Sequence, residues 1–147
     1  MTIDFPEVQR STQWTPVVRT YGLTPAQRSL YARLRELAAL SENWDGYGSP
    51  SIQPRTISQA TTVLQLLARL PIASPQIFPI AGGGIQFEWQ SETAELELEI
   101  LPDGHFEYLI ADSRREMREG RVPEYSDAFI CRLVQWFDQP NVTVGDL

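Results

Sequence analysis

Three runs of alternating apolar and polar residues between positions 82 and 112 constrain the fold of this chain more than any other stretch. Alternation with a period of two residues is typical of a strand that buries one face, and successive runs of this kind favour an antiparallel meander. The apolar positions are Ile85, Phe87 and Trp89, then Leu96, Leu98 and Ile100, then Phe106, Tyr108 and Ile110. The chain therefore predicts a sheet with one buried face.

A Pro-Asp-Gly turn at 102–104 sets the register between the second and third runs. Proline presets φ for the first turn position, and glycine accepts the positive φ required just after it. A type I turn followed by a glycine bulge places Leu101 opposite His105. This register brings the apolar residues of both strands onto one face and places Glu99 opposite Glu107.

The other face of the predicted sheet is acidic. We define the acidic face as Glu88, Glu95, Glu97, Glu99 and Glu107. The preceding turn at 90–93 puts Trp89 across from Leu96 and so places Glu88 opposite Glu97. Like charges directly opposite each other destabilise a sheet by about 0.2–1 kcal/mol per pair. No Lys or Arg occurs between residues 70 and 113 to relieve this repulsion locally.

Three interpretations of the acidic face follow from its composition. Water and salt can screen a solvated face of like charges. Alternatively, the arginines at 114, 115, 118 and 121 fold back over the edge of the sheet. In the functional interpretation, the acidic face docks a protein partner with a basic surface, because charge complementarity steers association.

The remaining chain predicts three helices and one further strand. Apolar residues recur at helical spacing over 24–40, 54–70 and 123–140. The segment 76–80 predicts a short edge strand, because it contains a proline. The charged segment 113–121 is predicted to be a loop or a frayed helix.

Together these elements predict an α+β fold with two N-terminal helices, a three- to four-stranded antiparallel meander and a C-terminal helix. The helices pack on one face of the sheet, because its apolar side needs a cover. We expect an extended N-terminal arm at 1–22, a single domain at 23–140 and a polar tail at 141–147. Exposed edge strands would also allow a homodimer to form by strand pairing.

A loop with the sequence NWDGYG at 43–48 has two aromatic residues and two interpretations. In the structural interpretation, Trp44 and Tyr47 fill the joint between two helices, while Asp45 accepts hydrogen bonds from the backbone of the turn. In the functional interpretation, Asp45 is the polar centre of a ligand site that has Trp44 and Tyr47 as walls.

The composition excludes several classes of function. The net charge is −7, which argues against general nucleic-acid binding and against an anionic membrane surface. All twelve basic side chains are arginine, so neither a Schiff-base lysine nor a P-loop lysine is present. One histidine and one cysteine leave no zinc cluster and no internal disulfide, so we expect no cofactor or metal. No membrane span or secretory signal is evident, and we expect a cytoplasmic protein.

Four features follow one another along the chain: the NWDGYG loop, an alanine-containing helix, the string GGIQFEW at 83–89 and an acidic alternating strand. In the order of these features the chain resembles a family of small prokaryotic proteins. The resemblance covers roughly residues 30–109. It implies a common fold and a link to mobile or defence genes, and it implies no catalytic residues.

Two functional hypotheses follow. The first is a non-enzymatic binding subunit or adaptor, similar to an antitoxin, an immunity protein or a defence component, that docks a basic partner on the acidic face. The alternative is a small-ligand-binding protein or an enzyme centred on the Asp45 loop, or on His105 with Glu107 and Glu99. Mimicry of nucleic acid by the carboxylate rows is a third idea, but five glutamates are few for that purpose.

Overall fold

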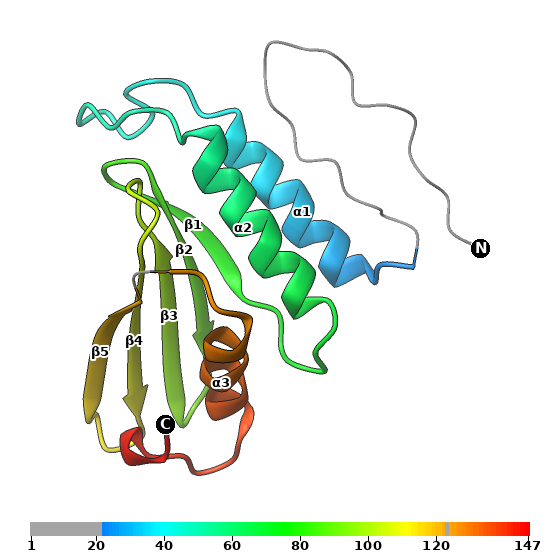
Figure 1. The fold of residues 1–147 in the computed structure, drawn as a ribbon, viewed down its shortest axis with the longest axis vertical. Helices are drawn as coiled ribbons and strands as arrows, with labels where there is room; N and C mark the ends of the chain where they lie inside the picture. The colour runs from blue at the N-terminus through cyan, green and yellow to red at the C-terminus, as the bar shows by residue number, and fades with distance from the viewer. Residues whose placement is uncertain (1–21, 123) are drawn as a thin grey trace.

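A five-stranded antiparallel sheet and three α-helices make up the fold (Figure 1). The computed structural model describes residues 22–122 and 124–147, so the predicted arm lies outside the described residues apart from Gly22. The elements in chain order are α1 (Pro25–Ala38), α2 (Pro54–Leu67), β1 (Gln76–Ile80), β2 (Gly84–Gln90), β3 (Ala94–Ile100), β4 (Phe106–Asp112), β5 (Met117–Val122), α3 (Asp127–Asp138) and the 3-10 helix η1 (Val144–Asp146). The α+β class, with two helices before the sheet and one after it, is confirmed.

The predicted register is also confirmed. The backbone N–H of Leu101 donates to the carbonyl of His105 at 2.9 Å, and Gly104 has a φ of 92°, as the glycine bulge requires. The strands follow one another in the order β1-β2-β3-β4-β5, each antiparallel to the next. This meander places alternate residues of every strand on the same face.

The predicted strand count of three to four is wrong, because the structure has five strands. The segment predicted as a loop or frayed helix at 113–121 contains most of β5. Its sequence, MREGRV, lacks alternating apolar residues because no face of this strand is deeply buried. Pairing with β4 imposes the strand conformation, and a tight turn in which Arg115 has a φ of 63° leads into it.

The helices cover the apolar face of the sheet. Figure 1 shows α2 and α3 over the same face, with α1 beside α2. Helix α2 contacts β2 and β3, while α3 contacts β3. The side chains of Phe87, Leu96 and Phe106 are at most 1% exposed beneath them. The acidic face is therefore left on the side of the sheet that the helices do not cover.

Capping residues determine where α1 and α3 begin. Thr24 and Gln27 form the predicted capping box at the start of α1. Helix α3 begins at Asp127 rather than at 123, because the Ser126 hydroxyl accepts the N–H of Phe129 and caps the helix there. Within residues 22–122 and 124–147, none of the helices has the length and apolar character needed to cross a bilayer.

The segment predicted as a polar tail packs against the body of the protein. Val142 is 3% exposed and belongs to the core. The carboxylate of Asp112, at the end of β4, accepts the backbone N–H of Val144 at 3.1 Å and the N–H groups of Arg114 and Glu116 at 2.9 and 3.1 Å. Asp112 thereby connects the β4–β5 turn to η1.

Candidate functional site

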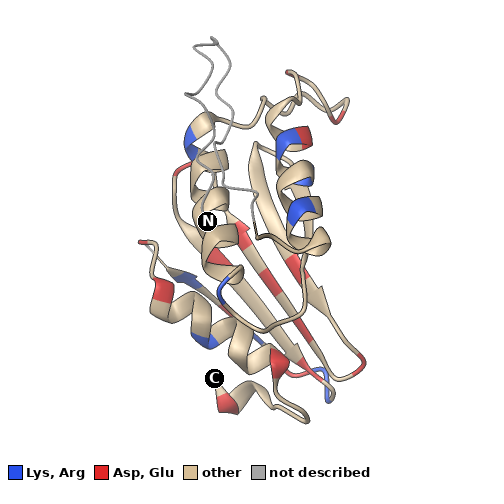
Figure 2. Cartoon of the chain, turned by 90° about the vertical axis from the view of Figure 1, so that its right-hand side faces the viewer, with Lys and Arg blue, Asp and Glu red and all other residues tan. Residues whose placement is uncertain are grey.

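The acidic face occupies three adjacent strands. Glu88 lies directly opposite Glu97 across β2 and β3, and Glu99 lies directly opposite Glu107 across β3 and β4, as the sequence predicted. Glu95 continues the row on β3 and lies opposite Gln90. Figure 2 shows acidic positions recurring along neighbouring strands of the sheet. The fold thus brings together all five predicted glutamates.

Partial burial, together with this clustering of charge, changes the ionisation of the two central carboxyls. The pKa of Glu97 is raised, first by partial burial and then by the charges of Glu88, Glu99 and Glu95. The pKa of Glu99 is raised by partial burial and by the opposing charge of Glu107. Each shift means that ionising the group is less favourable in the folded chain than in the unfolded chain.

Few cations offset these charges. Among ion pairs between described residues, the one that reaches the acidic face joins Arg121 Nε to Glu107 Oε1 at 3.7 Å. The same guanidinium lies 3.1 Å from Asp103 Oδ2 in the β3–β4 turn. Of the four arginines considered for a fold-back over the sheet edge, Arg121 makes such a contact, at one end of the row. The ion pairs between described residues include none from Arg114, Arg115 or Arg118 to the acidic face. Glu97 and Glu99 have no ion pair or side-chain hydrogen bond within the described residues.

Apolar side chains that were not predicted as site residues border the acidic face. Phe78 of β1 lies opposite Gln86 and is 37% exposed, and Met117 of β5 is 63% exposed. A depression of about 430 Å³ beside Met117 is lined also by Glu95 and Ala111. The strand register places both side chains on the face of the glutamates, Phe78 through its pairing with Gln86 and Met117 through its pairing with Ala111. The sequence carried no signal for Met117, because β5 lacks alternating apolar residues. Carboxylates beside apolar surface suit the charged tip and aliphatic stem of an arginine or lysine.

The NWDGYG loop uses its aspartate internally. Asp45 Oδ1 accepts the N–H groups of Tyr47 and Ser49 at 2.9 and 3.1 Å, and Oδ2 accepts the Ser49 hydroxyl. The Ser49 oxygen in turn accepts the N–H of Gly82 at 3.1 Å, which ties the loop to the β1–β2 turn. These hydrogen bonds, that from the Ser49 hydroxyl above all, lower the pKa of Asp45.

The aromatic residues of the same loop diverge. Trp44 Nε1 donates to the carbonyl of Pro50 at 2.9 Å, so its ring is held against the loop. Tyr47 is 94% exposed and does not fill the joint between the helices. The three predicted loop residues, Trp44, Asp45 and Tyr47, are close in sequence but do not enclose a common space.

His105 and Glu107 have different partners. His105 Nδ1 lies 3.0 Å from Asp103 Oδ2, whereas Glu107 is paired with Arg121. The structure therefore does not show the acid–base couple considered from the sequence. In the described part of the chain, no group of three or more His, Cys, Asp or Glu side chains is arranged to hold a metal ion.

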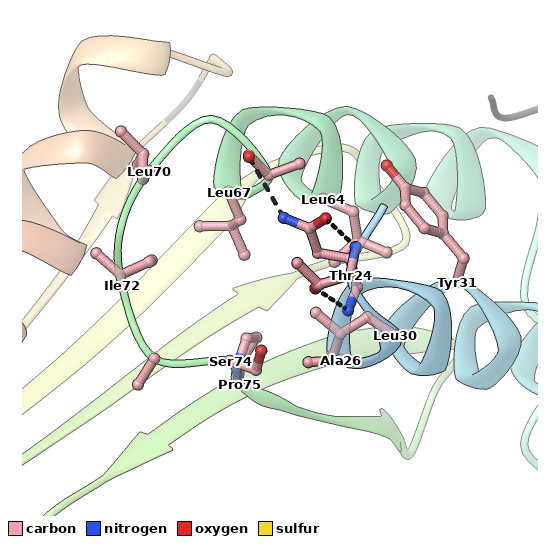
Figure 3. Close-up of a pocket in the computed structure, with 13 residues that line it drawn as sticks. Thr24, Ala26, Leu30, Tyr31, Leu64, Leu67, Leu70, Ile72, Ser74 and Pro75 are labelled. Atoms are coloured by element: carbon pink, nitrogen blue, oxygen red, sulfur yellow. Dashed lines mark hydrogen bonds between the residues drawn. The ribbon is translucent and has the colours of Figure 1, made fainter. Parts of the chain in front are cut away.

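A cavity of about 270 Å³ lies between the start of α1 and the end of α2 (Figure 3). Its lining includes Leu30, Tyr31, Leu64 and Leu67 and contains no charged side chain. The polar side chain of Gln27 is occupied by the capping box and by a 3.4 Å contact to the Ala68 carbonyl. The sequence carried no signal for this cavity, because apolar helix stripes are ordinarily core.

Comparisons with protein families, with curated proteins and with solved structures found no match to the chain. The choice between the two hypotheses therefore depends on the geometry of the acidic face and of the Asp45 loop.

Proposed function

We propose that this chain is a non-enzymatic protein-binding subunit or adaptor whose acidic face docks a partner with a basic surface. The observation that carries the proposal is the direct register of Glu88 with Glu97 and of Glu99 with Glu107, on the sheet face that the three described α-helices do not cover (Figure 1). Each such pair costs about 0.2–1 kcal/mol of folding stability. Solubility alone does not require this arrangement, since interspersed charges of both signs achieve it.

Binding of a basic partner removes the repulsion. One guanidinium or ammonium group of the partner can lie between Glu97 and the opposing Glu88, and another between Glu99 and the opposing Glu107. Each group then makes charge-assisted hydrogen bonds to two carboxylates that otherwise repel each other. The exposed Phe78 and Met117 supply apolar contacts at the two ends of the face. Association of this kind is fast and sensitive to salt, because steering by complementary charge weakens as ionic strength rises. An antitoxin, an immunity protein or a defence adaptor would function in this way.

The test is capture of a partner from the native host at low salt. The tagged parent chain is compared with the triple variant Glu97→Gln, Glu99→Gln, Glu107→Gln. A matched control carries Glu42→Gln, Glu124→Gln and Asp138→Asn, which change the net charge equally at exposed positions outside the sheet. We expect a stoichiometric protein partner with the parent and the control, and its loss with the triple variant and at high salt. Equal capture by all three proteins would exclude the acidic face as the docking surface.

The alternative, ligand binding or catalysis at the Asp45 loop, has weaker support. Both carboxylate oxygens of Asp45 already accept hydrogen bonds from the loop. A thermal-shift screen with metabolites and metal ions distinguishes the two ideas. A ligand-specific shift that disappears in Asp45→Asn would favour the loop, and its absence would leave the acidic face as the better-supported site.

A further inference from the structure

The two edges of the sheet differ in their capacity to accept another strand. At β1, Pro79 has no N–H to donate, and Arg33 Nε of α1 donates to the carbonyl of Ile77 at 3.0 Å. At the other edge, no described element lies beyond β5 (Figure 1). Four of its six residues are exposed and the other two are only partly buried. β5 is therefore the edge of the described sheet that is open to strand pairing.

The hydrogen-bond alternation shows which backbone groups of β5 point outward. The N–H of Asp112 donates to the carbonyl of Glu116 at 3.1 Å, so this is a hydrogen-bonded pair of the β4–β5 ladder. In an antiparallel ladder such pairs alternate with non-hydrogen-bonded pairs. The β4–β5 register then directs the backbone groups of Gly120 toward β4 and those of Glu119 and Arg121 toward the free edge.

We propose that β5 pairs antiparallel with β5 of a second copy of this chain, with Gly120 at the two-fold axis. In this register the outward N–H and C=O groups of Glu119 face those of the partner's Arg121, and the reverse pair forms across the axis. Opposite residues share one face of a sheet, so each pair is also a cross-strand ion pair. A shift of one copy by two residues along the strand would place Glu119 opposite Glu119, or Arg121 opposite Arg121. Charge complementarity thus selects one register.

Gly120 suits this central position. A Cβ atom added there would lie 2.6 Å from ring atoms of Tyr108, so the ring of Tyr108 covers the glycine and excludes a side chain. Gly120 therefore adds no side chain of its own at the position where the two strands would cross the axis. Pairing joins the two five-stranded sheets and puts both acidic faces on the same side. This inference goes beyond the proposed function and does not depend on it.

The experiment is a charge exchange read by sedimentation velocity. The chain has a mass of 16.7 kDa, and a small interface of one strand pair is expected to be weak. Samples are therefore followed from about 10 µM to about 1 mM, which spans weak association. We expect the parent to double its mass at high concentration. Glu119→Arg alone and Arg121→Glu alone each bring like charges together across the axis, so each should dimerise at least about tenfold more weakly.

Mixing the two variants is the decisive step. In an equimolar mixture, residues 119 and 121 of one β5 each meet an opposite charge on the other, so we expect a heterodimer to form. A monomeric parent at the highest concentration, variants that dimerise as the parent does, or a mixture that stays monomeric would each overturn the proposal.

Amide exchange gives a second measurement that needs no variant, since Arg121→Glu also removes the contacts to Asp103 and Glu107. In the parent, the N–H groups of Glu119 and Arg121 should become protected as concentration rises, whereas that of Gly120 should not change. Concentration-independent exchange at Glu119 and Arg121 would contradict the pairing.

Discussion

Replacing Glu97 by Gln should stabilise the isolated protein, which tests the electrostatic argument without knowledge of any partner. Glu97 has Glu88 directly opposite and Glu95 and Glu99 two residues away on its own strand. The direct pair accounts for about 0.2–1 kcal/mol, and the flanking charges bring the expected gain to about 1 kcal/mol. In a domain of this size, that gain raises the Tm by about 3 °C.

The pH dependence gives the prediction a sign. The pKa of Glu97 is raised in the folded state, so its ionised carboxylate destabilises the fold. This destabilisation is absent at low pH, where the carboxyl is protonated in both the folded and the unfolded state. It develops as the pH rises through the raised pKa and is complete at neutral pH. The gain from Glu97→Gln should therefore be full at pH 7 and should vanish near pH 4.

Thermal and urea unfolding of the parent, Glu97→Gln and Glu42→Gln at both pH values measure this difference. Glu42 is exposed outside the sheet, so Glu42→Gln changes the net charge by the same amount without reducing the repulsion between the glutamates of the acidic face. A double-mutant cycle with Glu88→Gln isolates the direct pair, and we expect a coupling of about 0.2–1 kcal/mol. The reasoning is refuted if Glu97→Gln gives no gain at pH 7, or if Glu42→Gln gives the same gain.

Three further substitutions test the contacts described above. Asp112→Asn should lower the Tm and speed amide exchange in η1, because the carboxylate accepts three backbone N–H groups; its lowered pKa makes this stabilisation present at neutral pH and lost as the pH falls through that pKa. Unchanged exchange in η1 would contradict this role. Asp45→Ala should lower the Tm through loss of the loop hydrogen bonds, and an unaltered melting curve would show that the loop does not need them. Gly120→Ala should cost about 1–3 kcal/mol by overpacking against Tyr108, with partial recovery in the double variant that also carries Tyr108→Ala; a neutral Gly120→Ala in urea unfolding would disprove the clash.

The sheet could be predicted from the sequence where side chains alternate in polarity. The turn at 102–104 and the alternation of β3 and β4 were enough to place Glu99 opposite Glu107. The turn at 90–93, with Trp89 across from Leu96, was enough to place Glu88 opposite Glu97. Local turn chemistry and burial on one face both specify this register, so the positions of the acidic face were available before the structure.

β5 could not be predicted in the same way. Its residues are mostly exposed, so its sequence has no alternation of apolar and polar residues. Its conformation depends on pairing with the neighbouring β4. Asp112 also escaped notice, since its partner Val144 lies 32 positions away in the chain. For the same reason the cavity between α1 and α2 had no local signal. Features set by contacts between distant segments need the tertiary structure.

The Arg33 contact at β1 has a consequence for the size of any assembly. A protein with two open sheet edges can add copies at both, and such growth propagates into fibres. Here proline and a guanidinium occupy one edge, and a β5–β5 contact would use the other edge of both copies at once. Growth by strand addition would then terminate at two subunits.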